Sequence, residues 1–370
     1  MPGFRRGGAP YPLWPECQGA LPYHPEPRPC IITLMNSILR ISVAALLAVC
    51  IAFCGCSSKH EIQSLIRQAK SSDPSVRLEA VKGIADLENL RGTPALIERL
   101  SDADLAIRRE AVRALGELHD PRGVAPLAAA VQDDAVKLDA VASLGIIGPP
   151  ALDTLVALLG DPNPLVRARA ARSLGEMQDT RAIVPLMGAL KDAQPRVREN
   201  AALALGMKLD DRPTQALIEA LKDSDEWVSC RAASSLGNQK APGAAAALAD
   251  ALADPSPYVR SRAVWALGMI ADKSSLQSLV LTVGDQSPIV RQGAAWSLGQ
   301  FDDTAVLAPL YALLSDSDFR VRAAAIEALA NLKYPAAIPQ LKLAQNDSDP
   351  YVRWRAATAI KYIGGHGSME

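Results

Sequence analysis

The feature that most constrains this chain is a short motif that recurs at a nearly constant interval. The pair Val259-Arg260 is followed by equivalent pairs ending at Arg291, Arg322 and Arg353, each 31 residues after the last. Towards the N-terminus the same position is occupied by Val228-Ser229, Val197-Arg198, Val166-Arg167, Val136-Lys137, Ile107-Arg108 and Val76-Arg77, which makes ten copies. The spacing is 31 except beside Val136, where it is 29 or 30. Self-similarity at such a period is typical of a solenoid, in which each unit packs on its neighbours.

Each copy predicts two antiparallel helices. In the copy that ends at Gly206, we expect a first helix over residues 182–190 and a second over residues 196–205. Pairs such as Asn163-Pro164 and Ser256-Pro257 place an N-cap oxygen before a proline at the first helical position. Glycine is predicted to end the second helix in most copies, because it is favoured just after a helix C-terminus. These glycines are Gly116, Gly145, Gly175, Gly206, Gly237, Gly268 and Gly299.

The second helix has one apolar face and a polar register. Counting the Arg of the Val-Arg pair as position 0, positions −1, +3, +6 and +7 share a face, and in one copy they are Val259, Ala263, Ala266 and Leu267. An aspartate after the first helix recurs at the same period in seven copies, from Asp161 to Asp347. Because an Arg fork suits a carboxylate, we expect these columns to form a structural ladder rather than a phosphate-binding track. The predicted ladder comprises Arg198, Arg260, Arg291, Arg322 and Arg353 with Asp192, Asp223, Asp254, Asp285 and Asp316.

These motifs carry a resemblance to a known family. Val-Arg followed by Ala-Ala-x-Ala-Leu-Gly, and the segment Asp179-Thr180-Arg181-Ala182-Ile183-Val184-Pro185-Leu186, resemble HEAT repeats. They are similar in particular to the short repeats of phycobilisome lyase subunits. The resemblance covers about residues 60–362 and implies an all-α, right-handed α-solenoid of about ten two-helix units. It also implies that the second helices line the concave face.

On that face, positions +2 and +5 of the second helix vary from copy to copy, as expected of a surface free to specialise. Trp265 and Trp296 fall on adjacent copies, with Arg231 and Arg262 close by. Exposed Trp beside Arg is typical of a protein-binding hot spot, whereas the alternative is that each Trp seals the packing between repeats. Arg169 and Arg172 are further candidates for partner binding. Acidic Glu79, Glu110 and Asp139 in the first copies and basic Arg169, Arg231 and Arg262 later either orient a partner along the groove or form a plain solvated face.

The N-terminal region is predicted to be a targeting segment. Residues 1–34 are rich in Pro and Gly, and we expect them to be an untranslated or disordered leader before Met35. The apolar run from Ile41 to Phe53 has the length of a signal-peptide core. Gly55-Cys56 then resembles a bacterial lipobox, although Phe53 stands where an aliphatic residue is usual. The resemblance implies a signal peptide over residues 35–55, lipidation of Cys56 and an anchor over residues 56–59.

Two modes of attachment to a membrane are open. A lipidated Cys56 would hold the repeats on the cell envelope, at the outer membrane or the periplasmic face of an organism with two membranes, because Ser57 is not an inner-membrane retention signal of the Asp type. The alternative is one membrane helix over Cys30–Cys56, broken by Arg40. Residues 363–370 are expected to form a flexible tail.

The sequence indicates a membrane-anchored scaffold that binds a protein or peptide, not an enzyme, with no cofactor and no metal. The four histidines are scattered, and five of the six cysteines precede the repeats. A formal net charge of −1 does not favour nucleic acid, whose binding depends on phosphate neutralisation. The alternatives are a lyase-like enzyme subunit of the phycobilisome type and a nucleic-acid-binding protein, both of which require a cytoplasmic location.

Overall fold

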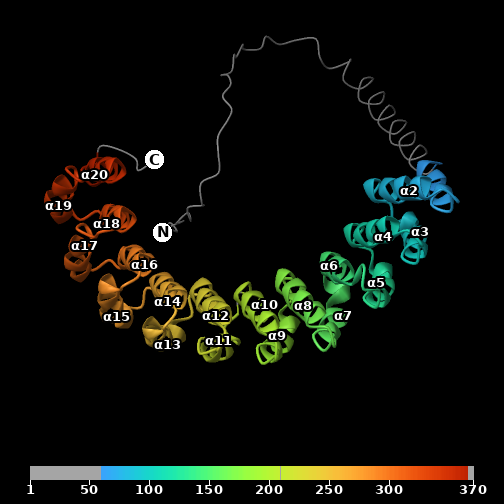
Figure 1. Ribbon diagram of the computed structural model, residues 1–370, viewed down its shortest axis with the longest axis horizontal. Coiled ribbons are helices and arrows are strands. Elements are labelled where there is room, and N and C mark those ends of the chain that lie inside the picture. The colour runs from blue at the N-terminus through green and yellow to red at the C-terminus, as the bar shows by residue number, and fades with distance from the viewer. Residues whose placement is uncertain (1–59, 209, 366–370) are drawn as a thin grey trace, which may run out of the picture. The chain divides into compact units, whose positions relative to one another are not determined.

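The computed structural model describes residues 60–208 and 210–365, which form a stack of paired helices (Figure 1). No β-strand occurs in these residues, so the prediction of an all-α solenoid is confirmed. The second helices are α2 (Pro74–Asp86), α4 (Leu105–Glu117), α6 (Lys137–Ile147), α8 (Pro164–Glu176), α10 (Pro195–Gly206), α12 (Glu226–Asn238), α14 (Pro257–Ile270), α16 (Pro288–Leu298), α18 (Phe319–Leu332) and α20 (Pro350–Ile363). The first helices are residues 60–68, α3 (Thr93–Arg99), α5 (Val124–Ala130), α7 (Leu152–Leu158), α9 (Ile183–Ala189), α11 (Thr214–Ala220), α13 (Ala245–Asp250), α15 (Leu276–Leu281), α17 (Leu307–Leu313) and α19 (Ile338–Ala344).

Short 3-10 turns join the helices. Most lie directly before a first helix: η1 (Leu90–Gly92), η2 (Pro121–Gly123), η3 (Pro149–Ala151), η4 (Thr180–Ala182), η5 (Pro242–Ala244), η7 (Lys273–Ser275), η9 (Thr304–Val306) and η10 (Pro335–Ala337). Two others, η6 (Ala251–Ala253) and η8 (Thr282–Gly284), extend α13 and α15. None of the helices in the described part of the chain is long and apolar enough to cross a membrane.

Several predicted segments lie outside the described residues. They are the leader 1–34, the signal peptide 35–55, the anchor 56–59 with Cys56, and residues 366–370 of the tail. The last helix includes Ile363, the first residue of the predicted tail.

Local sequence explains where the second helices begin. The Asn163 side chain accepts a hydrogen bond from the backbone N–H of Leu165 at 2.9 Å, and Pro164 opens α8. Ser256 caps α14 in the same way by accepting from the N–H of Tyr258 at 3.3 Å. These contacts satisfy backbone donors that have no partner inside the helix, and they confirm the predicted capping by Asn163 and Ser256. Ser287, which stands in the same position before Pro288 of α16, makes no such hydrogen bond.

The core runs along the whole stack between first and second helices. The predicted core residues of α14 are all buried, with Val259 1% exposed and Ala263, Ala266 and Leu267 fully buried. The second helices lie on the inner side of the described arc and the first helices on the outer side (Figure 1). The prediction that second helices line the concave face therefore holds for the described repeats.

The predicted role of the recurring glycines holds only in part: Gly206 ends α10 and Gly299 caps α16, whereas the other five glycines lie inside their helices. Gly206 is the last residue of α10 and Gly237 lies inside α12, and neither has a positive φ. A Cβ built on Gly206 would lie 2.8 Å from the backbone Cα of Ser235 on α12, and one on Gly237 would lie 2.9 Å from the Cα of Ala266 on α14. Glycine at this position therefore lets successive second helices approach closely, and it is not required by the backbone conformation of a helix end.

Arginines at position 0 connect each repeat to the next. Arg260 donates from Nε and Nη2 to the two carboxylate oxygens of Asp285, both at 2.8 Å. Its Nη1 donates to the backbone carbonyls of Asp254 at 2.9 Å and Pro255 at 3.1 Å. The Arg260 hydrogen bonds lower the pKa of Asp285. Seven such ion pairs join position 0 of one repeat to an aspartate 25 residues later: Arg77–Asp102, Arg108–Asp133, Arg167–Asp192, Arg198–Asp223, Arg260–Asp285, Arg291–Asp316 and Arg322–Asp347.

The series is interrupted where position 0 is not arginine. Ser229 donates to the carbonyl of Asp223 at 3.2 Å but cannot reach the next repeat, so the Asp254 carboxylate receives no arginine from the described residues. Lys137 pairs with Asp134 in its own connector. Arg353, in the last described repeat, contacts the carbonyls of Asp347 at 2.7 Å and Ser348 at 3.0 Å. Asp254 and Arg353, both included in the predicted ladder, therefore lie outside these seven pairs.

Candidate functional site

The solvent-facing stripe of each second helix consists of positions −2, +2, +5 and +9. At about 100° per residue these positions fall within one narrow sector of the helix, opposite the core. Because the second helices lie on the inner side of the arc, this stripe forms the concave surface (Figure 1). We call it the concave stripe.

The two tryptophans singled out from the sequence stack on one another. The rings of Trp265 on α14 and Trp296 on α16 lie 6.3 Å apart between centroids, with an angle of 17° between their planes. Both side chains are half-buried. The Trp265 ring also covers Gly237, where an added Cβ would lie 2.8 Å from the ring. Trp265 therefore packs on α12 while part of the stacked pair remains accessible to solvent.

A second row of exposed apolar residues was missed in the sequence. At position −2, Trp227, Tyr258 and Ile289 follow one another on α12, α14 and α16, and they are 53%, 51% and 45% exposed. The rings of Trp227 and Tyr258 are stacked, with centroids 6.1 Å apart. The helical period could have found this row, because position −2 lies one turn before position +2 on the same stripe.

Arginines lie between the two apolar rows. Arg231 on α12 is exposed and its Nε donates to Glu199 at 3.2 Å. Arg262 on α14 is exposed and makes no hydrogen bond or ion pair with any described residue. It follows Tyr258 by four residues and precedes Trp265 by three, so the three side chains share one stripe. We call Trp227, Tyr258, Ile289, Trp265 and Trp296, with Arg231 and Arg262 between them, the aromatic patch.

The other two predicted partner-binding residues lie apart from this patch. Arg169 and Arg172 are on α8, two repeats before α12. Arg169 is exposed, whereas the Nε of Arg172 donates to Glu176 at 3.1 Å. They continue the concave stripe but do not contact the aromatic rows. Cys56 lies outside the described residues.

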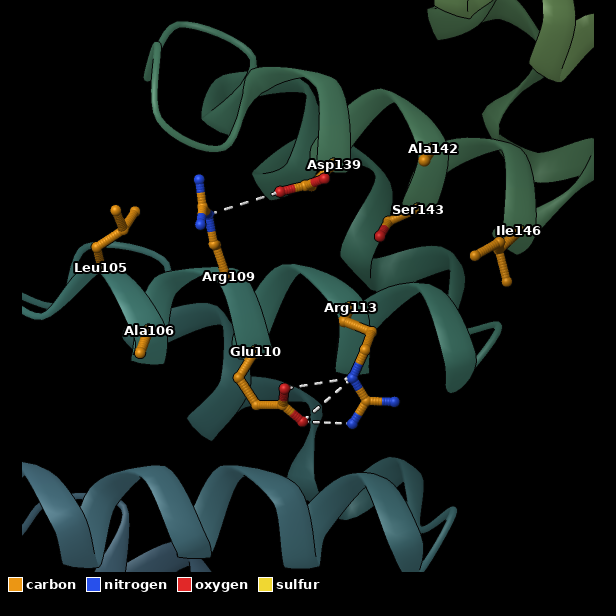
Figure 2. A pocket seen from close by; sticks show the side chains of 9 residues that line it. All are labelled: Leu105, Ala106, Arg109, Glu110, Arg113, Asp139, Ala142, Ser143 and Ile146. Atoms are coloured by element: carbon orange, nitrogen blue, oxygen red, sulfur yellow. Dashed lines mark hydrogen bonds and ion pairs between the residues drawn. The ribbon is translucent and has the colours of Figure 1, made fainter.

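A groove lies between α4 and α6 on the same surface (Figure 2). It has a volume of about 720 Å³ and is lined by Leu105, Ala106, Arg109, Glu110, Arg113, Asp139, Ala142, Ser143 and Ile146. Its cause is local: α6 begins at position 0, whereas the neighbouring second helices begin three residues earlier, so α6 lacks its first turn. Arg109 reaches across to Asp139 at 3.9 Å, and Arg113 pairs with Glu110.

The described residues include no cluster of three or more His, Cys, Asp or Glu side chains placed to hold a metal ion. Cys230 is buried beside the patch, and burial raises the pKa of its thiol to about 11. This thiol is therefore protonated at neutral pH and is a poor nucleophile.

The fold and its open concave stripe define an α-solenoid built from two-helix repeats. A family model for HEAT repeats matches residues 62–145, 152–217, 214–286 and 279–361. The chain belongs to the HEAT repeat family, as its sequence motifs predicted. Solenoids of this family commonly serve as scaffolds for protein interactions. None of the curated proteins compared with the chain matches its sequence.

Solved structures with the same fold include an importin-β and a karyopherin. The chain is 15% identical to yeast importin-β (Kap95p), with a TM-score of 0.59 over 83% of this chain and 51% of that one. It is 19% identical to the karyopherin Kap121p bound to the extreme C-terminus of the phosphatase Cdc14p, with a TM-score of 0.56 over 82% of this chain and 41% of that one. The chain therefore spans about half or less of these two proteins, and at this identity the likeness shows the fold alone.

Proposed function

We propose that this protein is a membrane-anchored scaffold that binds a protein or peptide partner on the concave side of its solenoid. The observation that carries the proposal is the aromatic patch. Five apolar side chains, among them the stacked pair Trp265–Trp296, gather on three adjacent repeats, and Trp227, Tyr258 and Ile289 are about half exposed. Clustered Trp, Tyr and Arg are the side chains that most often carry binding energy at protein interfaces. Kap121p, which shares the fold, is bound to a protein segment in its solved structure.

The binding part of the proposal is tested by quantitative affinity capture with the full chain from membrane extracts. Trp265→Ala with Trp296→Ala removes the stacked pair, and Trp227→Ala with Tyr258→Ala removes exposed rings that carry less of the packing. Tyr351→Ala with Trp354→Ala is the matched control, since these rings are also paired, at 5.8 Å, and 48% and 51% exposed, but lie on the last helix. We expect partner recovery to fall at least about tenfold for both patch variants and to persist for the control.

Retention of every partner by both patch variants would place binding elsewhere. Circular dichroism and thermal unfolding of each variant separate loss of binding from loss of folding.

The anchoring part of the proposal rests on Cys56 and the apolar run before it, and it places the solenoid on the cell envelope.

Anchoring is tested by the intact mass of the protein from the membrane fraction. A chain that begins at Cys56 and carries acyl groups, and that is absent in Cys56→Ala, supports lipidation. A soluble chain that begins at Met1 or Met35 would remove the envelope location, and the lyase-like alternative would then return.

A further inference from the structure

The concave stripe is electrically polarised along the solenoid. On α2, α4 and α6, carboxylates outnumber basic groups: Glu79, Asp86, Glu110, Glu117 and Asp139 face only Lys82 and Arg113 at the stripe positions. From α8 to α16 the balance reverses, with Arg169, Arg172, Arg196, Arg231 and Arg262 against Glu176 alone. The near-zero net charge of the whole chain conceals this division.

Three of these arginines are not used by the fold. Arg169, Arg196 and Arg262 are exposed, and none of them makes an ion pair with another described residue. The position 0 arginines differ, because each of the seven paired ones is largely buried against its aspartate. The guanidinium groups on the stripe are therefore available to an external anion, and Arg presents a fork that matches a carboxylate.

The aromatic rows flank these arginines on both sides. With a rise of about 1.5 Å per residue, position −2 lies about 6 Å before Arg262 along α14, and position +5 lies about 4.5 Å after it. Within each row the ring pairs on adjacent helices are 6.1 Å and 6.3 Å apart. Alternate side chains of an extended polypeptide are separated by about 6.6 Å, which matches this ring spacing. Gly293 occupies the same position on α16 and adds no side chain to the arginine row.

We infer that the aromatic patch binds an extended acidic segment of a partner protein, with carboxylates at Arg262 and apolar side chains on the flanking rings. This inference rests on the proposed function and names the chemistry of its partner. The carboxylates of α2–α6 repel such a segment, so it lies over α8–α16. Like charges placed opposite one another disfavour the wrong register or the wrong partner.

The inference is tested with a random 16-residue peptide library displayed on phage and selected against the full chain. Enriched peptides are then synthesised, and their affinities are measured for the parent chain and three variants. Arg262→Glu reverses one free charge on the patch. Lys222→Glu makes the same charge change at an exposed residue after α11, outside the concave stripe. Trp265→Ala with Trp296→Ala removes the stacked rings.

We expect the enriched peptides to combine Asp or Glu with aromatic or aliphatic residues. Their affinity should fall at least about tenfold in Arg262→Glu, less than about twofold in Lys222→Glu, and several-fold when salt is raised, because exposed charges are screened. Two outcomes would overturn the acidic partner and leave the proposed function intact. In both, the peptides lose binding to the Trp variant; in the first they are neutral or basic, and in the second they bind Arg262→Glu as well as the parent chain. Peptides that bind the Trp variant as tightly as the parent, or an absence of enrichment, would overturn both.

Discussion

Replacing Arg260 with alanine should weaken the solenoid more than its position near the surface implies. The side chains of Arg260 and Asp285 are only 15% and 12% exposed. The substitution leaves the Asp285 carboxylate with the N–H of Ser287, at 2.8 Å, as its remaining hydrogen-bond donor among the described residues. It also removes the donor to the carbonyls of Asp254 and Pro255.

The expected loss follows from these contacts. Breaking a buried ion pair by removing one partner costs about 3–5 kcal/mol, and partial solvent access reduces the cost here to about 2–4 kcal/mol. Arg260→Lys keeps the charge but cannot reproduce the fork, so about 1–2 kcal/mol should be lost. Ser229→Ala is the internal control, because this position 0 side chain makes a single hydrogen bond, at 3.2 Å, and should lose less than about 1 kcal/mol.

The measurement is urea unfolding followed by far-ultraviolet circular dichroism, combined with amide hydrogen exchange resolved by helix. Since repeats interact mainly with their neighbours, the loss of protection should concentrate in α14 and α16. An Arg260→Ala variant that is no less stable than Ser229→Ala would refute the claim that the Arg–Asp pairs hold adjacent repeats together.

Three further predictions concern other contacts between repeats. Gly206→Ala should cost about 1–3 kcal/mol in urea unfolding because its Cβ meets the α12 backbone, whereas Gly188→Ala, with nothing within 4 Å, should be neutral or stabilising. Lys208→Met should cost about 1–3 kcal/mol in urea unfolding, because Nζ of Lys208 donates to the carbonyls of Leu174 at 2.8 Å and Gly175 at 3.0 Å. Lys208→Gln should retain part of this stabilisation, because Gln239, at the equivalent position one repeat later, donates to the Leu205 carbonyl at 2.9 Å. Acid should lower the urea midpoint, because the Arg-bonded aspartates have lower pKa values in the folded protein than in the unfolded chain. Their contribution to the free energy of unfolding is complete above about pH 4 and is lost as the pH falls through the pKa values of the folded protein. Arg260→Ala should flatten this pH dependence, and an unchanged slope would count against the assignment.

Much of the fold could be predicted because the same local sequence features recur in each repeat. The Val-Arg interval indicates the repeats, whereas the N-cap before proline and the buried residues of α14 follow from capping chemistry and helical periodicity within a single copy. The Arg and Asp columns could be recognised for the same reason, since residues with a common period must stack in neighbouring units.

What could not be predicted depends on distances between repeats. Gly206 and Gly237 both look like helix ends in sequence, and Gly206 does end α10, but only the approach of α12 to α10 and of α14 to α12 shows why a glycine is needed at each position. The shorter interval at Val136 was visible, but its consequence, a helix without its first turn and a groove beside it, depends on how α4 and α6 pack. The exposure of Trp227 likewise depends on what its neighbours cover.

The gap in the arginine series at Ser229 has a mechanical consequence. Where an Arg–Asp pair joins one repeat to the next, bending must strain that pair. Among the described repeats no such pair spans the joint between α6 and α8 or the joint between α12 and α14, so we expect less resistance to bending there. The aromatic patch straddles the second of these joints, because Trp227 lies on one side of it and Tyr258 on the other. A partner bound across α12 and α14 would restrain bending between them. Binding on the concave surface would therefore make the solenoid stiffer on both sides of this joint.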